Sequence, residues 1–454
     1  RNAQAESSNL SLGLIKKWFY LYYLVMIAPY FKILAKRNFS LLWSGQITSQ
    51  FGDKLTQLAL VSLVGFFFKN SSSLGLAVIF SMTIIPVIIF SPVTGVYVDR
   101  WDKRKTMYFC DFFRGALVLL IPLLFLKAIY FPLICLIIFI SSTLGRFFIP
   151  AKMAFIPQII EKKDIFIANT LISVTATTAA IFGIGMGGII VDNLGLKATF
   201  YIDALTFFIS AMFIFFIAKI EKKHFSPNDI MGLGREVVQN IKKSFLKELA
   251  EGFKYIMATD ETKYAFRTFL FLFSYLGAIS TVYIRYIQTT LGASSQDVKE
   301  VAFIGIFLGA GIFLGSLIYG RLAHRLSIKK VINYSSISAS FFLLFFVIWI
   351  KYNPLTLHAI VLSFILGVLL SPIFIAVNSL IHNTTKKALL GRIFGSLEFI
   401  AHLGFLITMF IASFLADLFD PFTIITTVGI IGSLFSIIFL INDVKSSRTQ
   451  SSSR

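Results

Sequence analysis

A stripe of polar residues interrupts an apolar stretch near the start of the chain. Gln46, Gln50, Asp53 and Gln57 follow one another at intervals of four, three and four residues. On an α-helix this spacing places the four side chains on one face. The amides can donate and accept hydrogen bonds, and the carboxyl group can take up and release a proton. The stripe therefore predicts a helix face that contacts a substrate or carries protons.

A second acidic residue, Glu398, lies in a late apolar stretch, six residues after Arg392. A charged group at the centre of a membrane costs roughly 2.5–3.5 kcal/mol to insert, so something must compensate it. For Asp53 the compensation is either a functional proton or a structural hydrogen bond to a neighbouring helix. For Glu398 it is either a second functional proton or an ion pair with a basic residue at the mouth of the helix.

Twelve apolar segments must position these side chains, and each is close to the roughly 20 residues that a membrane-spanning helix needs. Hydrophobic residues make up 57% of the chain and charged residues 14%, whereas soluble domains carry roughly 25% charged residues. We therefore predict an all-α membrane protein with two pseudo-symmetric bundles of six helices. The segments cover about 39–68, 74–98, 106–126, 131–150, 166–191, 197–218, 266–291, 300–323, 329–350, 354–379, 393–416 and 421–442.

The polar stretches divide the chain into five parts. The central stretch 219–265 has apolar residues at helical spacing among many charges, which predicts a cytoplasmic linker with an amphipathic helix. The parts are an interfacial N-terminal segment at 1–38, a first bundle at 39–218, the linker at 219–265, a second bundle at 266–443 and a cytoplasmic tail at 444–454.

The formal net charge of +20 comes largely from short loops between the predicted helices. One side carries basic clusters at 100–105 and 321–330, whereas the loops of the other side carry about one Lys each. Because cytoplasmic loops are enriched in Lys and Arg, we expect the basic side and both termini to lie in the cytoplasm, with the protein in the cell membrane. This topology explains the charge without a nucleic-acid partner.

The loop between the second and third segments has a regular pattern. Gly95 is followed by Asp99 and Arg100, and then by Lys103 and Arg104. Gly95 lets a neighbouring backbone approach closely. Asp99 can accept hydrogen bonds from the N-terminus of another helix. The pattern therefore predicts a structural role at the cytoplasmic side beyond that of a basic loop.

The same pattern recurs in the second half of the chain. Gly320 and Arg325 stand 225 positions after Gly95 and Arg100. A repeat at half the chain length is typical of two duplicated transporter halves. We expect these two loops to form a cytoplasmic gate, to which Arg114 contributes an ion pair.

The first loop resembles the signature loop of the major facilitator superfamily of transporters, with Asp102 in place of a second glycine. The resemblance implies alternating access between two halves. Further stretches, including 37–46 and 150–157, are similar to the macrolide-efflux branch of drug:proton antiporters, which also includes siderophore exporters and lysophospholipid transporters. The resemblance covers most of the chain from Arg37 to about Asp443.

Three glycines of the fifth segment, Gly183, Gly187 and Gly188, resemble a glycine motif of the exporters in which Ile184 replaces a proline. Glycines permit close helix crossing and bending. Two interpretations fit the pattern. The glycines either allow the helix to bend, as the resemblance implies, or only allow tight packing against a neighbouring helix.

The resemblance implies proton-coupled export of a hydrophobic or amphipathic, drug-like compound. The alternatives are a lysophospholipid transporter of the same branch and a non-transporting membrane receptor on the same fold. The sequence has no phosphate-binding loop of the ATP-binding type and no metal-ligand spacing of Cys or His, so we expect no cofactor, no metal and no enzymatic activity. The expected partners are a small amphipathic or lipid-like substrate, protons and membrane lipids, and the expected state is a monomer.

Overall fold

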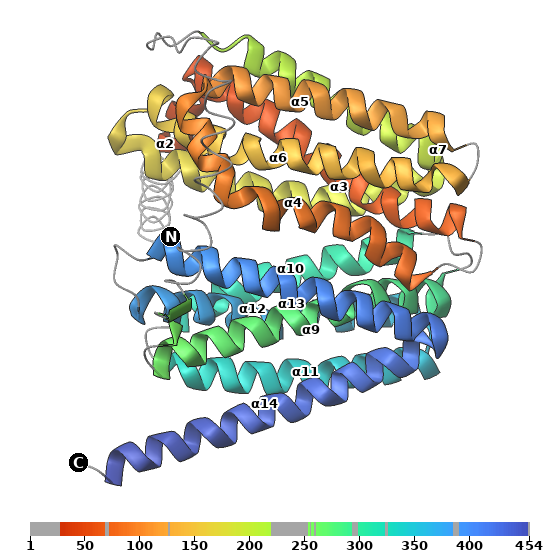
Figure 1. Ribbon diagram of the computed structural model, residues 1–454, viewed down its shortest axis with the longest axis vertical. Coiled ribbons are helices and arrows are strands. Elements are labelled where there is room, and N and C mark those ends of the chain that lie inside the picture. The colour runs from red at the N-terminus through yellow and green to blue at the C-terminus, as the bar shows by residue number, and fades with distance from the viewer. Residues whose placement is uncertain are drawn as a thin grey trace, which may run out of the picture.

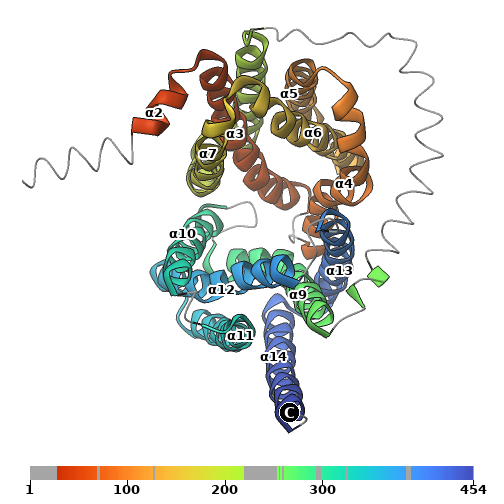
Figure 2. The ribbon, with the colours of Figure 1, turned by 90° about the vertical axis from the view of Figure 1, so that its left-hand side faces the viewer.

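The regular structure is helical throughout the part of the chain that is described. The computed structural model describes residues 28–68, 72–125, 128–218, 253–254, 256–257, 260–292, 298–322, 326–384 and 390–452. The helices form two groups, α2–α7 and α9–α14, which lie one above the other in Figure 1 and on either side of a common centre in Figure 2.

The first group contains five long helices and several short ones. They are α2 (Ala28–Leu34), α3 (Arg37–Phe67), α4 (Ser73–Arg100), α5 (Lys103–Leu120), α6 (Phe131–Ile159) and α7 (Ile165–Phe215), with 3₁₀ turns η1 (Ile121–Leu124), η2 (Ala128–Tyr130) and η3 (Lys162–Asp164). The expected interfacial segment 1–38 is described only from residue 28. The expected linker 219–265 lies almost wholly outside the described residues.

The second group contains six long helices. They are α9 (Asp260–Leu291), α10 (Lys299–Leu322), α11 (Ile328–Tyr352), α12 (Thr356–Thr384), α13 (Leu390–Leu418) and α14 (Pro421–Ser452). α14 continues into the stretch 444–454, which we expected to form a tail. After Gly432 the chain has no Gly or Pro that would end the helix.

Ten helical stretches of the described residues are long and apolar enough to cross a membrane. α3 is not among them, because its polar stripe lowers its hydropathy, although its 31 residues exceed the required length. α7 is counted once but contains two limbs. With α3 and the second limb of α7, all twelve predicted segments are accounted for, which confirms the all-α prediction.

The two limbs of α7 join at Gly195, which has a φ of 84°. Only glycine adopts this backbone conformation at little cost. The contacts with α3 show that the limbs are antiparallel. Trp43 bonds Thr175 and Gly183 abuts Lys54, so the first limb runs with α3. Residues further along α3 meet earlier residues of the second limb, as described for the site below.

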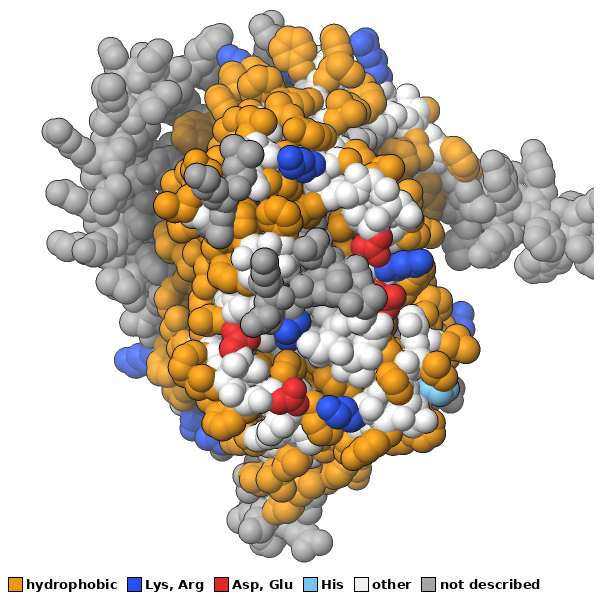
Figure 3. All heavy atoms as spheres, turned by 90° about the vertical axis from the view of Figure 1, so that its right-hand side faces the viewer, with side chains coloured by type: hydrophobic (Ala, Val, Ile, Leu, Met, Phe, Trp, Pro, Cys, Tyr) orange, Lys and Arg blue, Asp and Glu red, His pale blue; other side chains and the backbone are white. Residues whose placement is uncertain are grey.

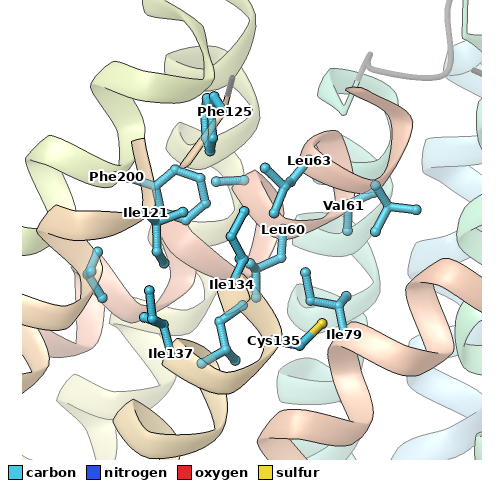
Figure 4. Close-up of a cluster of buried hydrophobic side chains, with 14 of the residues drawn as sticks. Leu60, Val61, Leu63, Ile79, Ile121, Phe125, Ile134, Cys135, Ile137 and Phe200 are labelled. Carbon is cyan, nitrogen blue, oxygen red and sulfur yellow. The ribbon is translucent and has the colours of Figure 1, made fainter. Parts of the chain in front are cut away.

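Hydrophobic side chains fill the interior of each group. One cluster joins α3, α4, α6 and the second limb of α7 around Leu60, Ile79, Ile134 and Phe200 (Figure 4). Comparable clusters in the second group surround Ala376 and Phe346. Close van der Waals packing of this kind, rather than exclusion of water, is what holds helices together in lipid.

The two groups meet near the ends where α4 and α10 begin. Asp417 at the end of α13 accepts hydrogen bonds from the backbone of Ser73 at 2.7 Å and from the hydroxyl of Ser72 at 2.5 Å. One helical turn after Ser73, Ala77 of α4 packs with Leu406 and Met409 of α13. At this end of the molecule, acidic and basic side chains are interspersed among hydrophobic ones (Figure 3).

Candidate functional site

The polar stripe of α3 meets a cation from α5. Nη2 of Arg114 lies 2.6 Å from Oδ1 of Asp53, a separation typical of a charge-assisted hydrogen bond. The side chain of Arg114 is 13% exposed and that of Asp53 is 40% exposed. Arg114 was expected at the cytoplasmic gate, but the structure places it against Asp53.

A second carboxylate, Asp111, lies on the other side of the same guanidinium group. Its Oδ1 is 3.8 Å from Nη1 of Arg114, and its Oδ2 accepts a hydrogen bond of 2.6 Å from Ser210 on α7. Cζ of Arg114 also lies 4.2 Å from the ring centre of Phe207, within the range of a cation–π interaction. Arg114 therefore joins two carboxylates that come from α3 and α5.

A third carboxylate, Asp203, projects from the second limb of α7 and is fully buried. It accepts hydrogen bonds from the hydroxyls of Thr56 on α3 and Thr206 on its own helix. Gly52 makes this approach possible, because a Cβ at that position would lie 2.2 Å from Oδ1 of Asp203 and 2.0 Å from the Thr206 hydroxyl. Helices α3 and α7 are thus in contact at the carboxylate itself.

Asp53, Arg114 and Asp203 line a cavity of about 480 Å³ inside the first bundle, whereas Asp111 is not among its lining residues. One part of its wall is charged or polar, and the rest is apolar. The lining residues that carry a charge or an amide are Gln50, Asp53, Lys54, Gln57, Arg114, Arg146 and Asp203. Those that are large and apolar are Leu60, Phe80, Val118, Ile121, Ile137, Ile138 and Phe207.

Arg146 brings a second guanidinium group into this cavity from the middle of α6. It interacts electrostatically with Arg114 and Asp53, and with Glu398 from α13 of the second bundle. Glu398 is exposed. Glu398, which was expected in the same cavity, interacts with Arg146 but is not among the residues that line the cavity.

Three of the four residues of the predicted stripe line the cavity: Gln50, Asp53 and Gln57. Gln57 accepts a hydrogen bond of 3.2 Å from Lys54. Gln46 does not line the cavity; it lies one turn before Gln50 on α3 and is buried, with 5% of its surface exposed. The face of α3 that the spacing defines thus borders the cavity at three of its four residues.

The predicted gate residues can be located only in part. Gly95, Asp99 and Arg100 belong to the last turns of α4, but their side chains lie outside the described part of the structure. Arg325 lies outside the described residues. Gly320 is exposed near the end of α10, and a Cβ there would meet nothing within 4 Å.

The part of the signature loop from Asp102 onward is held by hydrogen bonds to the backbone. Asp102, which replaces the second glycine of the family pattern, is the N-cap of α5 and accepts a hydrogen bond of 2.9 Å from the backbone of Lys105. Lys103 donates to the carbonyl of Trp101, and Arg104 donates at 2.8 Å to the carbonyl of Phe215. Arg104 thereby links the start of α5 to the end of α7.

The glycines of the fifth segment act as contact points between helices. A Cβ at Gly183 would lie 2.7 Å from Lys54, and one at Gly187 would lie 3.2 Å from Leu58, both on α3. A Cβ at Gly188 would lie 2.4 Å from Ala302 on α10 of the other bundle. The backbone stays helical at these glycines, and the bend of α7 lies at Gly195 instead.

Sequence reasoning missed the roles of Arg146, Asp203 and Asp111 in this site. A charged residue within an apolar segment was visible in all three cases, and such residues usually face the bundle interior. The sequence does not give the rotation of each helix about its axis. The convergence of Arg146 and Asp203 on one cavity, and the contact of Asp111 with Arg114 beside it, could therefore not be read from the sequence.

Comparison with known proteins agrees with this architecture. A family model described as Major Facilitator Superfamily matches residues 42–351 and 264–454. Because these matches cover most of the chain, the protein belongs to this superfamily of transporters. It is accordingly a multi-pass integral membrane protein and not an enzyme.

Individual relatives share this assignment. The uncharacterized MFS-type transporter YkuC of Bacillus subtilis is 27% identical, over 80% of this chain and 82% of its own length. Multidrug resistance protein MdtG of Escherichia coli is 23% identical, over 79% and 83%. The crystal structure of the nucleoside transporter NupG matches with a TM-score of 0.67 at 14% identity, over 88% of this chain and 98% of that one. The last likeness concerns the fold alone.

Proposed function

We propose that the protein exports small amphipathic compounds by alternating access and that proton entry drives the export. The observation that carries this proposal is the ion pair of Asp53 and Arg114 in the wall of a cavity of about 480 Å³. In this superfamily fold, substrate and coupling-ion sites lie near the midplane of the membrane. The relationship to a protein named for multidrug resistance supports the direction of transport.

The arrangement of charge supports proton coupling. Arg114 pairs with Asp53 at 2.6 Å and also interacts with Asp111 and Asp203. Two other cations interact with these carboxylates: Lys152 with Asp111, and Arg146 with Asp53. A proton on Asp53 would neutralise the carboxylate charge that pairs with Arg114. Asp53 is open to the cavity, so this proton could enter from it and return to it.

The composition of the cavity wall supports an amphipathic substrate. One part of the wall offers hydrogen bonds and charge, from Gln50, Gln57 and Arg146. The other part offers an apolar surface, formed by Phe80, Ile137 and their apolar neighbours. Ligand sites commonly combine a largely apolar wall with a few placed polar groups. A compound with one polar end and one apolar body fits both parts of this wall.

The topology that we propose places the basic end of the molecule and both termini in the cytoplasm. The end where Ser72, Ser73 and Asp417 join the two bundles then faces the outside. The described arrangement is, under this proposal, closed toward the outside. The cavity lies wholly within the first bundle, and we propose that a monomer suffices for transport.

Purified protein in liposomes tests the proposal. Hydrophobic dyes, macrolides and lysophospholipids are each offered with and without a pH gradient, and vesicle uptake is measured in the orientation that corresponds to export. We expect gradient-dependent movement of at least one drug-like compound. Movement that is equal with and without the gradient would refute proton coupling, and movement of lysophospholipid alone would favour the alternative substrate class.

A further inference from the structure

A second hollow lies on the outer surface of the first bundle, between α5 and the second limb of α7. Its volume is about 400 Å³. Five aromatic rings and one methionine line it: Tyr108, Phe109, Phe112, Phe208, Phe215 and Met212. The small, buried Ala211 lies among them and leaves the space open. We call this hollow the α5–α7 groove.

The groove is formed by two antiparallel helix faces. Tyr108 and Phe112 are four residues apart and therefore lie on one face of α5. Phe112 contacts Phe208 with ring centres 5.5 Å apart, and Tyr108 contacts Phe215 at 5.6 Å. The groove thus extends along the helices from the Phe215 end toward the membrane interior. Phe109, Phe112, Met212 and Phe215 are each about half exposed, so the groove is open outward.

Two basic residues stand at the Phe215 end of the groove. Arg104 is one helical turn before Tyr108, donates to the carbonyl of Phe215, and has its Cζ 5.8 Å from the centre of the Phe215 ring. Lys105 is exposed one turn before Phe109. Asp102, which precedes these two basic residues in the chain, is already engaged as the N-cap of α5. The groove therefore has an apolar body and a cationic end.

We propose that the α5–α7 groove binds an anionic phospholipid, whose phosphate contacts Arg104 and Lys105 and whose acyl chain lies along the aromatic residues. A lipid at the membrane surface presents these two chemistries in the same order, headgroup first and chain below it. Basic residues near the surface attract anionic lipids, and long basic side chains reach the headgroup level from a helix end. The proposal does not depend on the transported compound or on proton coupling.

The duplicated half of the chain provides an internal contrast. The residues 225 positions after Arg104 and Lys105 are Lys329 and Lys330, so the basic pair is kept. The residues at the same offset from Tyr108 and Phe112 are Asn333 and Ile337. Phe109 is matched by another aromatic residue, Tyr334, but Tyr108 and Phe112 are not, so most of the aromatic face of α5 is confined to the first half. Lys330 is an exposed, matched control for Lys105.

Native mass spectrometry of the purified full-length chain tests this proposal. The protein is titrated with phosphatidylglycerol or with phosphatidylcholine that carries the same acyl chains, and the fraction that retains lipid is measured. We expect tighter retention of phosphatidylglycerol, and a loss of about fivefold in its affinity for each basic residue removed. The variants are Lys105→Gln, the double variant Arg104→Gln with Lys105→Gln, Phe112→Leu, and the control Lys330→Gln.

Lys105→Gln and the double variant should weaken phosphatidylglycerol but not phosphatidylcholine. Phe112→Leu should weaken both lipids, and Lys330→Gln should change neither. Each variant's thermal unfolding midpoint is measured in detergent, and Lys105→Gln is at an exposed site that is compatible with folding. Equal retention of the two lipids by the unaltered protein would overturn the proposal. So would full displacement of the lipid by glycerol phosphate, which lacks a chain, or by a transported dye.

Discussion

Arg114 on α5 donates a hydrogen bond of 2.6 Å to the carboxylate of Asp53 on α3, across 61 positions of the chain. The pair lies in the wall of the central cavity of the first bundle, with Asp53 the more exposed member. Under the proposed function, a proton on Asp53 would remove the negative charge that pairs with Arg114. Because Arg114 is the partner of Asp53, a role of Asp53 in proton transfer can be tested separately from a role in holding α3 and α5 together.

The first prediction concerns Asp53→Asn. Asn preserves hydrogen bonding to Arg114 but cannot exchange a proton, so gradient-driven transport should fall at least tenfold while substrate binding and exchange persist. Transport into liposomes with and without a pH gradient provides the measurement. Asp420→Asn is the control, because Asp420 lies exposed at the start of α14 and Asn can replace it as a cap. Uphill transport at the unaltered rate in Asp53→Asn would exclude the proton role and direct attention to Glu398.

The second prediction concerns the coupling between Asp53 and Arg114. Arg114→Met should be strongly destabilising, because it leaves Asp53 and the buried Asp111 without their cation. Adding Asp53→Asn should restore part of the lost stability, with a coupling free energy of about 0.5–3 kcal/mol. Thermal unfolding of the two single variants and the double variant gives this value. Strict additivity would mean that the two side chains do not interact in the folded protein.

The fold could be predicted from the sequence because each membrane-spanning helix is encoded by its own apolar run. The polar face of α3 could be predicted for the same local reason, since a spacing of three and four residues defines one face. Gln50, Asp53 and Gln57 do line the cavity. These inferences need no knowledge of how distant segments pack.

The partners of Asp53 could not be predicted in the same way. Arg114 was expected to pair at the cytoplasmic gate, because only its distance along the helix could be judged from the sequence. Its direction depends on how α5 is rotated, and this rotation is fixed by contacts such as that of Gly115 with Ala204 on α7. Arg146 likewise enters the cavity through the packing of α6. Helix rotation is a tertiary property and leaves little trace in a single sequence.

The third prediction concerns Gly52→Ala. Its Cβ would overlap Oδ1 of Asp203 and the hydroxyl of Thr206, so α3 and α7 must separate. We expect a loss of about 1–3 kcal/mol of stability. Gly320→Ala is the matched control, because a Cβ there meets nothing and alanine favours helix by roughly 0.5–1 kcal/mol. The midpoint of thermal unfolding should fall in Gly52→Ala and should not fall in Gly320→Ala. A lower midpoint in Gly320→Ala than in Gly52→Ala would contradict the described packing.

The fourth prediction concerns pH and Lys36, which precedes α3 and contacts Asp164 at 3.0 Å and Glu161 at 3.2 Å in the loop after α6. The hydrogen bond to Asp164 raises the pKa of Lys36 above its usual 10.5. Its stabilising contribution is therefore complete below pH 10.5 and is lost as the pH rises through the higher, folded-state pKa. Hydrogen bonds from Lys163 and Lys36 lower the pKa of Glu161 below 4.5, so its contribution is present above pH 4.5 and is lost as the pH falls.

Lys36→Gln should accordingly lower the unfolding midpoint most near neutral pH, and the difference should shrink at both extremes. The effect should be small, because partly exposed ion pairs contribute at most about 1 kcal/mol. Lys163→Gln separates the two effects, because Lys163 contacts Glu161 within the same loop at 2.8 Å and its removal should weaken only the dependence at acid pH that Glu161 causes. A difference between Lys36→Gln and the unaltered protein that stays constant from pH 4 to pH 11 would show that the charge of Lys36 is not involved.

The last prediction concerns the contact between the two bundles at Gly188. A Cβ on this residue would lie 2.4 Å from the Cβ of Ala302 and 3.2 Å from the backbone of Lys299 on α10. Gly188→Ala should therefore press α7 and α10 apart and favour the state in which this end is open. The neighbouring Gly187 faces α3 of its own bundle, where a Cβ would meet Leu58 at 3.2 Å. Gly187→Ala adds the same methyl group to the same helix without touching the other bundle.

Spin labels at Leu194 and Leu418, which are exposed in the first and second bundles at this end, report the separation. Gly188→Ala should shift the distance distribution toward longer values, whereas Gly187→Ala should leave it unchanged. An overpacking cost of about 1–3 kcal/mol would change the ratio of the two states by roughly 5- to 150-fold, which is well within the range that such distributions resolve. Transport should slow in Gly188→Ala, because the state closed at this end becomes harder to reach. An unchanged distribution together with an unchanged rate would mean that α7 and α10 do not form the contact that closes the outer side.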